Sequence, residues 1–419
     1  MSVQINIAAI APALRQMNDE GFPKQFEEDT QTFNLFGESD APFTNGKGFR
    51  IPSNLRPSTG YGGVSEGGSF NQPNAMVNDD MYVYTFQAAQ AFELSGRTIR
   101  NVESETAIID GVTGIIENVS DTFRKELNYD VLGDGSGLRA IYKSGTTTLT
   151  LYNSTGHTPT SGFGSTKGAV RLKVGGWYDV YDSTLATFRG SFQVTSKTNT
   201  TAVINAAVSG ITDTDVIVPQ NSLLKLPRGL AYIVNNDTGV FQLLSRSTYP
   251  ELKSPVTDLN GAAISVSDFS KTKRLLLARS GIGKAKKLAA ILSLAQDDAL
   301  CRLGQTYKRW EGNAKTFDGS FDAFAHGDTV FKVDPDVDED RIYLVAPMLI
   351  KRYKEMDFGL YDYDGNELRM KSGTGGYGSD AYTGAVGFSG NWGTPEPRCH
   401  ALIKRCSVTG LATQVASQA

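Results

Sequence analysis

One long amphipathic segment, residues 104–132, constrains the fold more than any other part of the chain. Its apolar residues recur at spacings of three and four, which places them on one side of an α-helix. This stripe consists of Ile108, Val112, Ile115, Val119, Phe123 and Leu127. A helix of that length spans about 43 Å and needs an equally long surface to pack against. Gly111 and Gly114 each cost about 1 kcal/mol relative to alanine, so a break there is the alternative.

A glycine-rich and lysine-free stretch, residues 51–96, precedes the helix. Residues 48–51 and 81–86 on its two sides are β-prone, so we predict two extended arms joined by a flexible tip. Such a hairpin is marginally stable alone and needs a further surface, for which we expect another subunit. The candidate contact residues at the tip are Arg56, Gly60, Tyr61, Gly62, Gly63, Gly67 and Gly68. The alternative is a disordered or active-site loop within a monomer.

The chain beyond the helix begins with a β-rich part. Residues 133–137 (GDGSG) are a strong stop signal for the helix. The sequence that follows is rich in threonine, serine, glycine and valine. Short strands with turn residues between them are predicted at 170–174, 192–195, 201–204 and 216–218. We interpret this part as a small antiparallel barrel or sandwich that is inserted between two halves of a larger fold.

From residue 230 the pattern indicates mixed α/β structure that turns to β structure near the C-terminus. The expected strands lie at 231–234, 288–294, 329–333, 342–345, 385–388 and 400–403. Helices are expected at 268–279 and 295–309. The late strands would supply the sheet against which the long helix packs.

Composition narrows the class of protein. With 419 residues, 40% of them hydrophobic, the chain is long enough for about three globular domains. A formal net charge of −4 argues against a global surface for binding nucleic acid. Three cysteines provide no disulfide framework. Because no signal peptide or membrane-spanning stretch is apparent, we expect a protein made and kept in a cytosol.

The sequence also contains a run of aspartates at alternating positions. They are Asp334, Asp336, Asp338 and Asp340. Their spacing resembles a calcium loop, but Glu339 occupies the position that requires glycine. Acidic turns surrounded by solvent are the preferred interpretation, with calcium binding as the alternative.

No group of residues matches an enzyme or cofactor site. Residues 373–378 satisfy the pattern GxGxxG, but the sequence after them does not open a convincing helix for a nucleotide phosphate. Cys399, His400 and Cys406 fall short of the four ligands of a structural zinc site. The three histidines of the chain belong to no HExxH or nucleophile-elbow pattern. We therefore expect no catalytic residues, no cofactor and no metal.

The order of N-terminal arm, extended loop, long helix, α/β part and returning strands resembles the major capsid protein of tailed bacteriophages, with the Hong Kong 97-type fold. Three stretches carry the likeness: residues 288–300 (LAAILSLAQDDAL), 333–347 (VDPDVDEDRIYLVAP) and 386–393 (VGFSGNWG). The resemblance implies an α+β subunit. Its parts are an N-terminal arm (1–44), an extended β-hairpin loop (45–98), a first peripheral part with the spine helix (99–140), an inserted β-barrel-like domain (141–227), an axial α/β domain (228–345) and a second peripheral part with the C-terminal strands (346–419).

Subunits of this family form pentamers and hexamers whose extended loops overlap neighbouring subunits. The resemblance implies the icosahedral shell of a virion, assembled in the host bacterial cytoplasm and enclosing double-stranded DNA without sequence specificity. It also implies a portal, a possible decoration protein and, since residues 1–44 leave little room for a cleavable segment, a separate scaffolding protein. The prototype crosslinks a loop lysine to an asparagine. Here Lys47 lies only at the base of the loop, so noncovalent overlap is expected.

Two other classes of protein are alternatives. A nanocompartment shell protein of the encapsulin type has a similar fold but packages enzymes, and the large β insertion and the glycine-rich arms favour the phage protein. A phage tail or adhesion protein would be built of β domains, and the continuous long helix and the α/β part argue against it.

Overall fold

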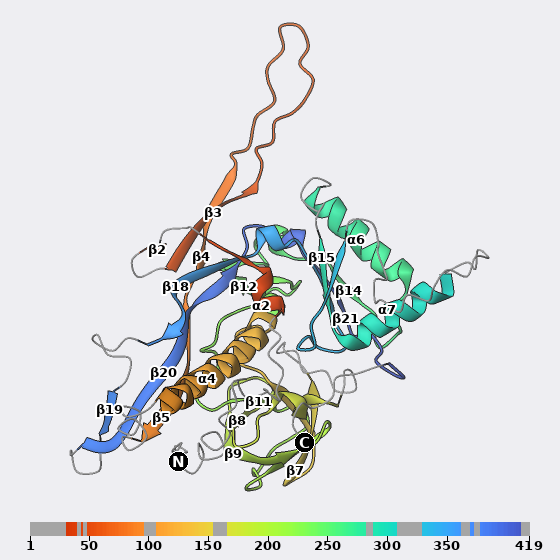
Figure 1. Ribbon diagram of the computed structural model, residues 1–419. Coiled ribbons are helices and arrows are strands. Elements are labelled where there is room, and N and C mark those ends of the chain that lie inside the picture. The colour runs from red at the N-terminus through yellow and green to blue at the C-terminus, as the bar shows by residue number, and fades with distance from the viewer. Residues whose placement is uncertain are drawn as a thin grey trace.

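The computed structural model is an α+β subunit with a long hairpin that projects from its body (Figure 1). The described residues are 31–39, 43–44, 48–95, 106–153, 166–281, 288–307, 329–361, 369–372 and 378–411. Strands predominate over helices in this part of the chain, in agreement with the high glycine content. Within these residues, none of the helices has both the length and the apolar composition that crossing a membrane requires.

Helix α4 (Thr106–Leu132) is continuous, and Gly111 and Gly114 do not break it. Phe123 and Leu127 are buried, and Val119 is partly buried against the same core. Packing of an apolar face is what stabilises helices in proteins, and it outweighs the unfavourable propensity of two glycines. The side chains of the first half of the predicted stripe lie outside the described residues, namely those of Ile108, Val112 and Ile115.

The long helix packs beside a five-stranded sheet built around β20. The strands are β1 (Gly37–Glu38), β5 (Phe86–Ser95), β18 (Lys351–Leu360), β19 (Arg369–Ser372) and β20 (Gly378–Gly393). β1 joins in parallel, and the other pairs are antiparallel. Helix α2 (Gln31–Leu35) contacts α4 and places the ring of Phe33 6.4 Å from Phe388 and 6.1 Å from Trp392. The main hydrophobic core therefore lies between the helices and this sheet.

The projecting hairpin consists of β3 (Gly48–Arg56) and β4 (Val77–Val83), which pair antiparallel with Ile51 opposite Met81. β2 (Phe43–Thr44) adds a short third strand. Met81 and Val83 are buried, so the base of the hairpin belongs to the main core. Its outer part extends well beyond the body (Figure 1).

The β-rich insertion is a closed barrel with the strand order β10, β7, β6, β11, β8 and β9. The strands are β6 (Ala140–Ser144), β7 (Thr148–Asn153), β8 (Trp177–Tyr181), β9 (Phe188–Lys197), β10 (Thr201–Ile204) and β11 (Val216–Pro219). All neighbouring pairs are antiparallel. Buried side chains such as Leu151, Val180 and Phe192 give the barrel a core of its own.

Residues 170–174 do not form the predicted strand. Residues 168–171 make the 3-10 turn η1 (Gly168–Arg171) instead. The alternation of apolar and charged residues does not reflect alternating burial, because the Arg171 side chain is buried and its Nη2 lies 2.8 Å from Asp338 Oδ1. A period-2 pattern predicts a strand only where its polar members face water.

A second mixed sheet has the strand order β14, β21, β17, β15 and β16. The strands are β14 (Val256–Asp258), β15 (Ala289–Leu292), β16 (Val330–Val333), β17 (Ile342–Val345) and β21 (Ala401–Lys404). Helices α6 (Val266–Ser280) and α7 (Leu294–Tyr307) lie beside it (Figure 1). Ser265 caps α6, since its Oγ accepts a hydrogen bond from Asp268 N at 3.2 Å.

The strand predicted at 231–234 is wrong, because the residues form the short helix α5 (Leu230–Ile233). A short apolar run does not by itself distinguish a strand from a buried helical turn. Gly229 begins the turn, and a Cβ there would lie 1.9 Å from Val131 O at the end of α4.

The small remaining elements are β12 (Val240–Phe241), β13 (Leu244–Ser245), η2 (Pro250–Leu252), η3 (Pro347–Leu349) and η4 (Pro397–Cys399).

Candidate assembly surfaces

The outer part of the β3–β4 hairpin is exposed along its whole length. Every residue from 56 to 76 is exposed, and the relative exposure of Tyr61 is 104% and that of Phe70 is 88%. Beyond the paired strands, a single isolated bridge joins Thr59 to Asn74. The two exposed aromatic side chains make this segment a candidate surface for binding another molecule.

Six of the seven residues predicted at the tip lie on this segment beyond the strands. They are Gly60, Tyr61, Gly62, Gly63, Gly67 and Gly68. Gly60 and Gly67 have φ angles of 138° and 77°, which side chains other than glycine rarely adopt. Arg56 does not lie at the tip: it is the last residue of β3, where its Nε lies 2.8 Å from Glu251 Oε1 and its Nη2 donates to Thr248 O at 3.1 Å. A carboxylate and a carbonyl of its own chain are within reach, so Arg56 anchors the hairpin.

Further polar contacts hold the base of the hairpin. Arg50 Nη2 lies 2.7 Å from Asp80 Oδ2, across the β3–β4 pair. The Tyr249 hydroxyl donates to Asp79 Oδ2 at 3.3 Å, and the Arg56 guanidinium lies 5.8 Å from the centre of the Tyr249 ring. The base is thus attached to the body through residues 248–251, while the tip has its side chains in solvent.

The aspartate run at residues 334–340 is buried, which corrects the expectation of solvated acidic turns. Asp334, Asp336, Asp338 and Asp340 are all buried. Carboxylates in such positions require charged or hydrogen-bonding partners. Here the partners come from α2, from α4, from the turn η1 and from the residue that follows the run, Arg341.

The first half of the run binds α2 and α4. Asp334 Oδ2 accepts hydrogen bonds from the backbone N of Thr32 at 3.1 Å and from its hydroxyl, and from Asn128 Nδ2 at 3.1 Å. Asp336 Oδ2 accepts from the same Asn128 Nδ2 at 2.6 Å, and its Oδ1 lies 2.8 Å from Lys125 Nζ. Asn128 therefore connects two buried carboxylates to the long helix.

The second half of the aspartate run contacts the barrel. Arg171 Nη2 lies 2.8 Å from Asp338 Oδ1 and donates to Asp336 O at 2.7 Å. Arg341 Nε lies 3.3 Å from Asp338 Oδ2. We call these residues together the acid–base junction: Thr32, Lys125, Asn128, Arg171, Asp334, Asp336, Asp338 and Arg341. It joins helix α2, helix α4, the barrel and the segment between β16 and β17. Local sequence patterns contain no signal for it, since Lys125 and Arg171 look like ordinary surface cations.

The acid–base junction makes stability depend on pH. Burial raises the pKa of Asp336 to about 7 although the Lys125 ammonium opposes the shift, and burial also raises the pKa of Asp340. An aspartate in an unfolded chain has a pKa of about 3.9. Between these values the folded chain keeps a proton that the unfolded chain has released, so stability from Asp336 is greatest below about pH 4 and is lost toward about pH 7.

We therefore expect Asp336 to contribute a fall in the urea midpoint of the isolated subunit as the pH is raised from about 5 to about 7.5, against the opposite contribution of the buried His400 below about pH 6.5. Asp336→Asn should flatten this dependence, because the amide cannot ionise. The measurement is the fluorescence-detected unfolding midpoint of both proteins at several pH values. Midpoints that change with pH equally in the two proteins, or that fall more steeply in Asp336→Asn, would contradict the assignment.

A second group of buried charges joins the end of α4 to the start of the barrel. Arg139 Nε lies 3.0 Å from Glu126 Oε2, and Arg139 Nη2 lies 2.8 Å from Asp130 Oδ1. Lys173 Nζ lies 2.7 Å from Glu126 Oε1. Burial opposes ionisation of Glu126, but Lys173 and Arg139 outweigh it and lower its pKa to about 2. Three ion pairs of Arg139 and Lys173 with Glu126 and Asp130 therefore hold the barrel to α4.

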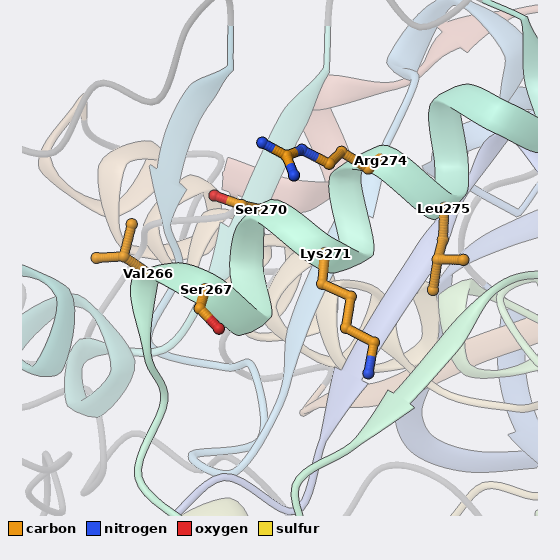
Figure 2. A pocket seen from close by; sticks show the side chains of 6 residues that line it. All are labelled: Val266, Ser267, Ser270, Lys271, Arg274 and Leu275. Carbon is orange, nitrogen blue, oxygen red and sulfur yellow. The ribbon is translucent and has the colours of Figure 1, made fainter.

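Helix α6 presents a basic face to solvent beside a hollow of about 720 Å³. Figure 2 shows Lys271, Arg274 and Leu275 on this face. All three are exposed, whereas Phe269 and Leu276 of the same helix are buried. The hollow is open, and the described residues that line it all come from α6.

His400, Cys399 and Cys406 near the C-terminus are all buried. Burial lowers the pKa of His400 to about 3. Its Nδ1 accepts a hydrogen bond from Ala346 N at 3.2 Å, and its Nε2 lies 3.2 Å from the hydroxyl of Thr394. Among the described residues no group of three potential ligands could hold a metal ion. Of the GxGxxG segment, residues 373–377 lie outside the described residues and Gly378 begins β20.

Two solved structures with a similar fold belong to capsids. The chain is similar to the cyanophage A-1(L) capsid subunit, with a TM-score of 0.55 and 11% identity, over 96% of this chain and 100% of that chain. It is also similar to the capsid subunit of the native GTA particle, with a TM-score of 0.51 and 9% identity, over 96% of this chain and 100% of that chain. No family model and no curated protein matches the sequence. The chain therefore has the α+β fold of phage capsid subunits, as the resemblance indicated.

Proposed function

We propose that this chain is the major capsid protein of a tailed bacteriophage, with the Hong Kong 97-type fold. In this proposal it assembles as pentamers and hexamers into the icosahedral shell of a virion. The observation that carries the proposal is a fold shared with two capsid subunits over 96% of this chain and the whole of theirs. The role is structural, and no enzymatic step is assigned to any residue.

The exposed hairpin supports assembly by noncovalent overlap. Residues 56–76 offer two exposed aromatic side chains and no lysine, so this part of the loop can bind a neighbouring subunit but has no lysine for a crosslink. Each contact need only be weak, because closed symmetry repeats it around the shell. In this scheme the loop (45–98) overlaps a neighbour, the helix of the first peripheral part (99–140) forms the spine, and the axial domain (228–345) faces the centre of each ring.

The remaining partners follow from the same proposal. A net charge of −4 favours enclosure of double-stranded DNA without tight or sequence-specific binding. A separate scaffolding protein, a portal and a decoration protein complete the assembly, which takes place in the cytoplasm of the host bacterium.

Electron microscopy of the purified assembly tests this function. We expect icosahedral shells when the chain is produced together with the products of its neighbouring genes, and few closed shells when it is produced alone. Shells that contain DNA support the phage protein. A smaller shell filled with another protein would support the encapsulin-type alternative, and fibres would support a tail or adhesion protein. A chain that stays monomeric under all these conditions would overturn the proposal.

A further inference from the structure

The hairpin tip carries a distinctive set of side chains. Between residues 57 and 76 the only charged residue is Glu66, and it lies between the exposed aromatic residues Tyr61 and Phe70. Val64 is also exposed. The tip therefore presents a few exposed apolar side chains and one negative charge among glycine and polar residues. A complementary surface would be an apolar groove that contains a positive charge.

The body of the subunit has such a groove at the opposite end of the hairpin. It has a volume of about 370 Å³ and lies between the segment that connects β4 to β5, the start of the barrel and the turn between β12 and β13. We call it the β12–β13 groove. Its lining includes three leucine or valine side chains that are about half exposed: Leu224, Val240 and Leu243. Apolar residues concentrated in this way favour a protein partner.

Among the described residues, the β12–β13 groove contains one cation, Arg228, and one anion, Asp134, whose Oδ1 accepts hydrogen bonds from the backbone N of Ser136 at 2.9 Å and from its hydroxyl. The Arg228 guanidinium is 5.3 Å from the centre of the Phe86 ring and 4.8 Å from that of Tyr232. Arg228 is partly exposed, so a carboxylate from outside can reach it. A guanidinium whose faces rest on aromatic rings keeps its N–H edges available for a carboxylate.

The backbone of the groove is held in an unusual conformation. Gln242 and Leu243 form the turn between β12 and β13 with φ angles of 45° and 74°, and Leu224 has a φ of 57°. Two-residue hairpin turns of this kind favour asparagine or glycine. The use of leucine at two left-handed positions keeps apolar side chains exposed at a conformational cost, as is common at binding sites.

A tip cannot reach the groove of its own chain. Tyr82 lines the groove, and the arm from there to Glu66 runs outward (Figure 1). At about 3.3 Å per residue this arm places the tip about 50 Å from the groove. Any occupant of the groove with the chemistry of the tip must therefore come from another copy.

Resting on the proposed shell function, we propose that the tip of one copy binds the β12–β13 groove of a second copy. Tyr61 and Phe70 contact the exposed apolar side chains of the groove, and the Glu66 carboxylate pairs with Arg228. The two surfaces are different, so the contact is head-to-tail. Repetition of a head-to-tail contact produces a ring when the rotation closes.

Photo-crosslinking on assembled particles tests the placement. Tyr61→p-benzoylphenylalanine is produced in a mixture of isotopically light and heavy copies, and crosslinked peptides are identified by mass spectrometry. We expect crosslinks between light and heavy copies, from position 61 to residues 224–243. Particles whose crosslinks lie elsewhere, or within one copy, would overturn this inference and leave the shell function intact. A chain that never assembles would overturn both.

A charge exchange tests the pairing independently. Glu66→Lys places a like charge against Arg228 and should weaken association by about tenfold or more. Adding Arg228→Glu should restore assembly. The matched control is Asp213→Lys, a charge reversal in an exposed turn of the barrel, which should assemble like the unmodified chain. Position 66 is fully exposed, so Glu66→Lys cannot act through misfolding. Equal assembly of Glu66→Lys and the control would overturn the Glu66–Arg228 pairing.

Discussion

We expect a chain that lacks residues 60–68 to fold normally and to fail to form stable shells. These residues are exposed and lie beyond the last bridge between the hairpin arms, at Thr59 and Asn74, so their loss removes no buried surface from the subunit. The contact that they would make with a neighbour is repeated at every subunit, and its loss is multiplied over the whole shell. Circular dichroism and the unfolding midpoint show whether the subunit is folded, and electron microscopy shows whether shells form.

The control for this deletion keeps the length of the loop. A variant in which residues 60–68 become alternating glycine and serine retains the reach of the hairpin but removes Tyr61, Val64 and Glu66. If side chains drive the contact, this variant also fails to assemble. Shells of the deletion that withstand heating as well as the parent shells would refute overlap by the loop.

The second large effect is expected at the acid–base junction. Arg171→Ala removes one cationic partner of Asp338, which keeps its ion pair with Arg341, and also removes the hydrogen bond to Asp336 O. Loss of one partner from a buried ion pair costs about 3 to 5 kcal/mol, because the remaining charge stays buried. We expect a large fall in the unfolding temperature of the subunit, with early proteolysis where the barrel joins the body.

Arg302→Ala is the matched control for this substitution. Arg302 forms an ion pair with Asp298 one helical turn away, and its side chain is 57% exposed. Exposed pairs of this kind contribute about 0 to 1 kcal/mol, so the unfolding temperature should hardly change. Equal shifts for the two alanine variants would show that the junction contributes no more than a surface ion pair.

The parts of the fold that were predicted correctly have local signals. Helix α4, with its apolar stripe at residues three and four apart, is visible in the sequence because the period of a helix repeats over many turns. Helix α6 and the buried strand β17 likewise lie where 268–279 and 342–345 indicated them. Long or strongly apolar segments leave few alternatives for the backbone.

The errors also have a common cause. Residues 170–174 alternate like a strand, and 231–234 form an apolar run like a strand, yet both have helical turns. In short segments the backbone follows the contacts of particular side chains, such as that of Arg171 with Asp338. The aspartate run at 334–340 was predicted to face solvent because its partners lie far away in the sequence and leave no local signal.

The sequence by itself determined the order of elements, the exposed character of the glycine-rich loop and the absence of lysine from it. These properties depend on residue type and on periodicity along the chain. Only the tertiary structure decided that Lys125 and Arg171 meet Asp336 and Asp338, and that Arg228 lies in an apolar groove. Such contacts depend on burial and on distances across the fold. In the sequence, a charged residue that becomes buried cannot be distinguished from one that remains in solvent.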